Sequence, residues 1–88
     1  MRIVSVDRKY DIPYKIAVVY VEHNETERRE TWEVKAEIDN RVVTMGKYKE
    51  KENCKQALLD MQEAFETTNE LYYYFPSEET AEYRRSRR

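Results

Sequence analysis

The sequence contains very little glycine, proline, cysteine or histidine: one Gly, two Pro, one Cys and one His in 88 residues. So little glycine and proline excludes a flexible linker and a glycine-rich phosphate-binding loop. The lone cysteine, Cys54, excludes an intramolecular disulfide, which suits a reducing compartment. His23 stands in a polar segment with no second ligand at a metal-binding spacing, and no serine–histidine–acid triad can be assembled around it. These absences predict a protein that is not an enzyme and that uses no cofactor or metal.

Long apolar stretches are absent too. No run is long enough to span a membrane, and the N-terminal residues lack the basic and apolar segments of a secretion signal. We therefore expect a cytoplasmic protein with no membrane association. Its 88 residues suffice for one small domain, whose core gives only marginal stability, so association with a second copy is a reasonable expectation.

Charged residues are abundant, at 39 %, but unevenly distributed. The formal net charge is −2, and the four arginines of the last six residues contribute +4, so residues 1–82 carry −6. These arginines are Arg84, Arg85, Arg87 and Arg88. An acidic body with a basic tip is untypical of nucleic-acid-binding proteins, whose positive charge covers a face. The tip predicts weak phosphate contacts at best, and a solubilising tail or helix end is the stronger interpretation.

A second candidate surface is acidic. Its members are Glu22, Glu25, Glu27, Glu33 and Glu37. Such a surface could imitate nucleic-acid phosphate and occupy a DNA- or RNA-binding protein. Lysine and arginine are interleaved with most of these acids, which favours an ordinary mixed face, and both interpretations stay open.

Alternating apolar and polar residues predict strands in the first half of the chain. The predicted strands cover residues 2–6, 15–22, 30–39 and 41–48. Residues 15–22 are apolar on both faces, which is typical of a central strand or of one covered by a second protomer. A hairpin loop is expected over residues 23–29. A tight turn is expected at residues 39–41, with Asn40 at positive φ. Gly46, in the fourth strand, marks a bulge or a close packing contact.

An amphipathic helix follows, because apolar residues recur at steps of three and four. The stripe contains Cys54, Ala57, Leu58, Met61, Ala64, Phe65 and Thr68. No Ser or Thr caps its start within residues 49–53, and Asn69 is the expected stop. The sequence thus predicts an α+β fold, an antiparallel β-meander of four to five strands with this helix packed on one face. The expected core contains Trp32, Val34, Ile38, Val43, Leu58, Met61 and Phe65. Residues 1–76 form the domain, and residues 77–88 form a tail or a short helix capped by Ser77.

The run Tyr72-Tyr73-Tyr74-Phe75 is the most unusual local feature. On a strand, Tyr72 and Tyr74 face one side while Tyr73 and Phe75 face the other. One pair should cover the core and leave the other as an exposed aromatic patch. Aromatic side chains with a polar tip are enriched at protein interfaces, so the patch predicts partner binding or a homodimer. Stacking on nucleotide bases is the alternative.

Three segments, MRIVSVDRKYDIPY, MGKYKEKENCKQALLDM and YYYFP, together resemble short proteins carried by phages and integrative elements of low-GC Gram-positive bacteria. The matching positions are Ile12, Pro13, Tyr14, Gly46, Tyr48, Tyr74, Phe75 and Pro76. The resemblance does not cover residues 22–39, and Lys49 and Glu50 stand where that pattern usually has Ser or Thr. It implies a bacterial mobile-element setting, in which small acidic proteins without catalytic residues often bind host machinery, defence systems included.

The leading hypothesis is accordingly a small, non-catalytic phage or mobile-element protein. It would bind a protein of the host or phage, and inhibit host defence machinery, through an acidic and aromatic surface. The alternatives are a nucleic-acid-associated accessory protein that uses the C-terminal arginines, and a nucleotide-binding protein with tyrosine stacking platforms.

Overall fold

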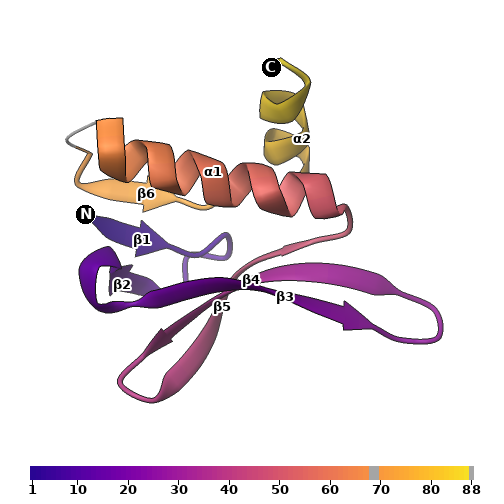
Figure 1. Ribbon diagram of the computed structural model, residues 1–88, viewed down its shortest axis with the longest axis horizontal. Coiled ribbons are helices and arrows are strands. Elements are labelled where there is room, and N and C mark those ends of the chain that lie inside the picture. The colour runs from indigo at the N-terminus through magenta and orange to yellow at the C-terminus, as the bar shows by residue number, and fades with distance from the viewer. Residues whose placement is uncertain (68–69, 88) are drawn as a thin grey trace.

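Two three-stranded sheets and two α-helices make up the computed structural model, which describes residues 1–67 and 70–87 (Figure 1). In chain order the elements are β1 (Arg2–Val4), β2 (Asp11–Pro13), a 3-10 turn (Tyr14–Ile16), β3 (Val18–Glu25), β4 (Glu30–Ile38), β5 (Arg41–Tyr48), α1 (Lys51–Thr67), β6 (Tyr72–Tyr74) and α2 (Glu78–Ser86). The α+β prediction is confirmed. In the described part of the chain, no helix has the length and apolar character needed to cross a membrane.

The strands form two sheets where the sequence predicts one meander of four or five strands. Strands β3, β4 and β5 form an antiparallel meander, while the second sheet has the order β2-β1-β6. In that sheet β1 runs antiparallel to β2 and parallel to β6, so the two ends of the chain pair with each other. The predicted meander is therefore wrong in its strand count and pairing. Strand β2 was not predicted because it contains Pro13, which an edge strand tolerates since no partner needs its missing N–H.

Local turn chemistry agrees with the predictions. Ile38 pairs with Arg41 across a two-residue hairpin loop, in which Asp39 and Asn40 have φ values of 49° and 62°. Two successive positive φ values are typical of the type I′ turn, whose twist matches that of the flanking strands. The expected positive φ of Asn40 is confirmed, and Asp39 also has a positive φ.

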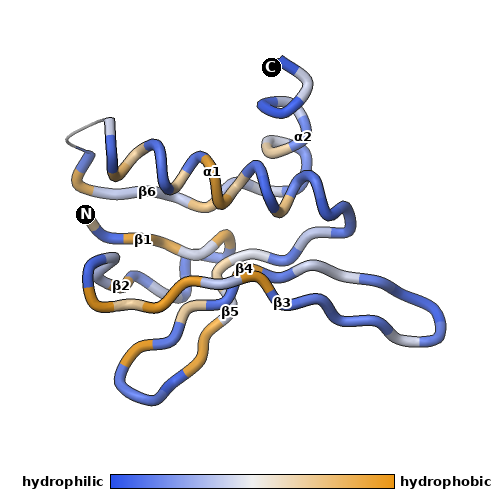
Figure 2. Tube along the Cα trace, in the orientation of Figure 1, coloured by the Kyte–Doolittle hydropathy of each residue, from blue (hydrophilic) through white to orange (hydrophobic). Residues whose placement is uncertain are grey.

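Figure 2 shows a hydrophilic tip on the longer β3–β4 hairpin.

Helix α1 lies against β4 and β5, and α2 packs against α1. The central buried cluster contains Ile3, Ile12, Val34, Ala36, Met45, Tyr48, Cys54, Ala57, Met61, Tyr73, Phe75 and Ala81. Four of the expected core residues, Trp32, Ile38, Val43 and Leu58, pack against it while partly buried. Phe65 is 42 % exposed, so its assignment to the core is wrong. The Phe65 ring instead packs on the ring of Tyr14, with centroids 4.6 Å apart. Figure 1 shows the C-terminal half of α1 beside β6.

The N-terminus of α1 is capped from a distant part of the chain. A carboxylate oxygen of Glu78 accepts hydrogen bonds from the main-chain N–H groups of Lys49 (2.8 Å) and Glu50 (3.2 Å). Glu78 begins α2, whose own cap is the Ser77 hydroxyl, which accepts from the N–H of Thr80 at 3.2 Å. The predicted cap at Ser77 is confirmed, and residues 78–86 are helical. The stop predicted at Asn69, like Thr68, lies outside the described residues.

Candidate functional site

Strand β6 divides its aromatic side chains between the core and the surface. Tyr73 and Phe75 are 7 % and 2 % exposed, whereas Tyr72 and Tyr74 are 42 % and 50 % exposed. The buried pair meets edge to face at 5.1 Å, and the Tyr73 hydroxyl donates to the carbonyl oxygen of Ala57 in α1 at 2.9 Å. Burial raises the pKa of the Tyr73 phenol. The alternation predicted from the sequence is confirmed, and the exposed pair is Tyr72 and Tyr74.

The exposed pair forms part of a small aromatic surface, which we call the tyrosine ledge: Arg8, Leu71, Tyr72 and Tyr74. The rings of Tyr72 and Tyr74 stack with centroids 6.0 Å apart, and the Arg8 guanidinium lies 4.6 Å from the centre of the Tyr74 ring. Leu71 is 75 % exposed. Arg8 reaches the ring from a loop in which its own φ is 66°. A cation over an aromatic face is attracted by the ring quadrupole, so Arg8 orients the ledge.

The loop that carries Arg8 is held by hydrogen bonds within residues 5–10, including the 3.0 Å bond from the Arg8 N–H to the Ser5 carbonyl oxygen. The carboxylate of Asp7 accepts from the Ser5 hydroxyl at 2.6 Å and from the main-chain N–H of Lys9 at 3.0 Å. These bonds, led by the one from Ser5, lower the pKa of Asp7. The ledge is therefore positioned by a loop that closes on itself.

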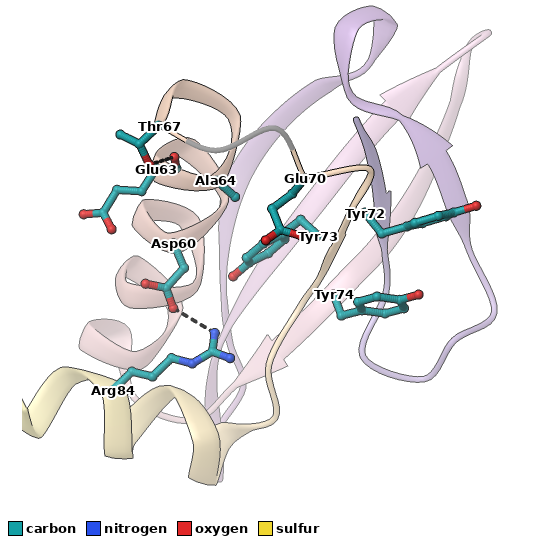
Figure 3. Close-up of a pocket in the computed structure, with 9 residues that line it drawn as sticks. All are labelled: Asp60, Glu63, Ala64, Thr67, Glu70, Tyr72, Tyr73, Tyr74 and Arg84. Carbon is teal, nitrogen blue, oxygen red and sulfur yellow. Dashed lines mark hydrogen bonds and ion pairs between the residues drawn. The ribbon is translucent and has the colours of Figure 1, made fainter.

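A groove of about 400 Å³ runs between α1 and β6, next to the ledge (Figure 3). Its lining residues are Asp60, Glu63, Ala64, Thr67, Glu70, Tyr72, Tyr73, Tyr74 and Arg84. Three carboxylates face one guanidinium in this lining, so the groove is acidic. Arg84 of α2 bonds to Asp60 at 3.1 Å, as the dashed line in Figure 3 shows. The structure thus brings an acidic groove and an aromatic ledge together at one edge of the molecule.

The acidic surface predicted on the meander is only partly formed. Glu22, Glu25, Glu27 and Glu37 are exposed. Glu33 is 6 % exposed, so its predicted place on an open acidic face is wrong. It is covered because Asn24 donates a hydrogen bond to it and the Lys35 ammonium lies 3.5 Å from its carboxylate. Strand alternation also places Glu25 on the opposite sheet face from Glu22.

The C-terminal arginines are distributed over separate contacts. Arg84 pairs with Asp60, and the Arg85 guanidinium lies 3.9 Å from Glu82. Arg87 donates to the Tyr83 hydroxyl at 2.7 Å. Arg88 lies outside the described residues. The three described arginines are therefore held along α2, and each already has a neighbour that competes with phosphate.

The sequence did not single out the acids of the groove or Arg8. Asp60, Glu63 and Thr67 follow one another at steps of three and four beside the apolar stripe, and Glu70 stands two residues before the aromatic run. That spacing next to an aromatic strand is a usable signal for a groove wall. Arg8 carried no comparable signal, because its contact with Tyr74 depends on the loop conformation.

Chemically reactive groups lie elsewhere or are buried. Cys54 is fully buried, and burial raises the pKa of its thiol to about 11. The His23 ring stacks on Trp32 at 3.9 Å and hydrogen-bonds the Glu30 carboxylate at 2.7 Å. Within residues 1–67 and 70–87, no three His, Cys, Asp or Glu side chains are grouped to hold a metal ion.

Comparisons with protein-family models, with curated protein sequences and with solved structures returned no match.

Proposed function

We propose that this chain is a small, non-catalytic binding protein that captures another protein through the tyrosine ledge and the acidic groove. The observation that carries the proposal is the exposure of Leu71, Tyr72 and Tyr74, at 75 %, 42 % and 50 %. Adjoining exposed apolar and aromatic side chains mark interaction sites, and tyrosine supplies contact area with little loss of side-chain entropy. The acids beside the ledge add a polar rim that selects a partner by charge.

A protein partner is favoured over nucleic acid by the charges around the ledge. Asp60, Glu63 and Glu70 would lie close to any phosphate backbone whose bases stacked on the tyrosines, and they would repel it. Arg84, which pairs with Asp60, offsets one of these three negative charges and leaves the groove lining net negative. Nucleic-acid and nucleotide binding are therefore the competing functions that the experiment must exclude.

The resemblance to proteins of phages and integrative elements supports a more specific proposal about the partner's origin. In that setting the captured protein belongs to the bacterial host or the phage, and the chain inhibits host machinery such as a defence system. An inhibitor that acts by binding needs no catalytic group of its own. It needs only a surface that covers a functional surface of the target protein.

The test begins with capture of partners from a bacterial lysate, their identification, and titration of the purified partner by calorimetry. The double variant Tyr72→Ala/Tyr74→Ala should bind at least about thirtyfold more weakly, because loss of the aromatic anchors of such an interface costs about 2 kcal/mol or more in total. Its melting temperature should stay close to that of the parent, since both side chains are exposed. Tyr83→Ala is the matched control, because Tyr83 is 59 % exposed on α2 and outside the ledge.

Full affinity of the double variant for the identified partner would overturn the proposal. So would tight binding of DNA or RNA that falls steeply with salt and is lost on deletion of residues 83–88.

A further inference from the structure

We infer that strand β6 accepts an extended, basic segment of a partner protein as an additional strand, which lies in the groove between β6 and α1. This inference rests on the proposed function, because it names the kind of segment that the binding protein takes.

The main chain of β6 is open on the groove side. Strand β6 is at the edge of the β2-β1-β6 sheet. Two main-chain hydrogen bonds flank β6 on the β1 side. The Leu71 carbonyl oxygen accepts from the Arg2 N–H at 2.8 Å, and the Phe75 N–H donates to the Val4 carbonyl oxygen at 2.9 Å. In a parallel ladder, successive residues direct their N–H and C=O groups to opposite sides. The main-chain groups of Tyr72 and Tyr74 therefore point away from β1, toward the groove.

The other wall of the groove is the right length for a short strand. Asp60 and Thr67, with Glu63 between them, are seven helical steps apart on α1, which is about 10 Å at the rise of about 1.5 Å per residue. At about 3.3 Å per residue, an extended chain places roughly three residues along that wall. Arg84 closes one end, where it binds Asp60. In Figure 3 α1 and β6 line the two sides of this space, and Tyr72 and Tyr74 point away from α1.

These two walls specify the side chains of the incoming strand. Alternate residues of an added strand point to opposite faces of the sheet. One set would lie toward α1, beside Glu63 and Asp60, and the other set would lie beside the rings of Tyr72 and Tyr74. The groove thus selects a segment in which basic residues alternate with apolar or aromatic ones. Main-chain pairing would supply affinity, and the alternate side chains would supply specificity.

A second copy of this chain fits the edge less well than a basic segment. Pairing of β6 with the β6 strand of another copy would bring both sets of groove acids together. Like charges that face each other at short range weaken association, so the edge favours a partner of opposite charge.

The decisive measurement is hydrogen exchange of the β6 amides, followed by NMR, with a short acetylated peptide of alternating lysine and valine as the probe. The amides of Tyr72 and Tyr74 should exchange at least tenfold more slowly in the complex. The amide of Phe75, already bonded to Val4, should change little. The same peptide with glutamate in place of lysine should not bind.

Two matched pairs of controls sharpen the result. N-methylation of the peptide residues whose N–H groups face β6 should abolish binding, whereas methylation of the intervening residues should be tolerated. Glu63→Lys/Glu70→Lys should weaken peptide binding about tenfold or more. The single variant Glu63→Lys should already weaken binding, whereas Glu66→Lys, an equal single charge reversal on α1 away from the groove lining, should have a much smaller effect.

The outcomes separate this inference from the proposed function. If the ledge variant loses the identified partner but the Tyr72 and Tyr74 amides stay unprotected in the complex, the protein binds by side chains and strand addition is wrong. Failure of the lysine–valine peptide to bind at millimolar concentration would also overturn strand addition, as would equal binding of the two N-methylated peptides. Protection that rises with protein concentration in the absence of peptide would make a second copy the occupant.

Discussion

The hydroxyl of Tyr48, at the end of β5, donates a hydrogen bond of 2.7 Å to the carbonyl oxygen of Pro76, the residue before the Ser77 cap of α2. Both residues are buried. To make this bond the Tyr48 ring lies across the strand over Gly46, two residues earlier on the same face. A Cβ at Gly46 would lie 2.7 Å from the Tyr48 hydroxyl oxygen and 2.8 Å from a ring carbon. The Gly46-Lys47-Tyr48 segment therefore attaches the C-terminal part of the chain to the meander, and glycine leaves the space for the ring.

We expect Gly46→Ala to reduce the free energy of unfolding by about 1–3 kcal/mol, because the ring must move or the strand must bend. Tyr48→Phe should cost about 1–2 kcal/mol, since it leaves the buried Pro76 carbonyl without its donor. In a Tyr48→Ala background, Gly46→Ala should reduce the free energy of unfolding far less. Urea denaturation of the parent, Gly46→Ala, Tyr48→Ala and the double variant measures this coupling between the two positions. Additive costs would contradict the packing of Tyr48 on Gly46.

The remote cap of α1 gives a second prediction. Glu78→Ala should lower the free energy of unfolding by about 1 kcal/mol, because the N–H groups of Lys49 and Glu50 lose their acceptor at the positive end of the helix. Hydrogen exchange at these two amides should accelerate. Glu79→Ala, at the neighbouring exposed position, is the control and should leave both measurements close to those of the parent.

Truncating two apolar side chains of α1, Met61 and Phe65, to alanine should lower the free energy of unfolding by different amounts. Met61 is 2 % exposed, so Met61→Ala should cost about 2–5 kcal/mol. Phe65→Ala should cost less than half as much, because Phe65 is 42 % exposed and loses mainly its contact with Tyr14. Chemical denaturation followed by circular dichroism ranks the two variants, and a larger loss for Phe65 would show that the end of α1 is more deeply buried.

Cys54 should be unreactive in the folded protein at neutral pH, because burial raises the pKa of its thiol from 9.0 to about 11. Since the folded pKa is the higher one, the stability that Cys54 contributes is complete below pH 9 and is lost as the pH rises toward 11. A disulfide reagent at pH 7.5 should label Cys54 at least tenfold more slowly than it labels the unfolded chain. Labelling at the unfolded rate would show that the thiol is accessible.

We also propose that the chain forms a homodimer through the outer face of the meander. Val18 and Val42 flank Glu37 in one cross-strand row and are 62 % and 53 % exposed. Size exclusion with light scattering should then give about twice the monomer mass of 10.8 kDa. Val18→Lys/Val42→Lys should restore the monomer by introducing like charges at the interface. A monomeric parent at micromolar concentration would end this proposal and leave the tyrosine ledge unaffected.

Several parts of the fold were predictable because they depend on residues close together in the chain. The clean alternation of β4, the positive φ of Asn40, the stripe of α1 and the cap at Ser77 follow from short-range geometry. The division of Tyr72 to Phe75 into an exposed and a buried pair follows from the same alternation. Which pair is buried was not predictable, because that depends on the side of β6 that α1 covers.

The sequence by itself thus determined the α+β class, the approximate bounds of β4, β5 and α1, and the presence of an aromatic patch, since each depends on a repeat of two or of three to four residues. Only the tertiary structure decided that β6 pairs with β1 and that Glu78 caps α1. It also decided that Glu33 is covered while Asp60, Glu63 and Glu70 line a groove beside the tyrosines. These contacts join segments from opposite ends of the chain or from different elements. Their formation depends on how the whole core packs, and a local pattern carries no information about that packing.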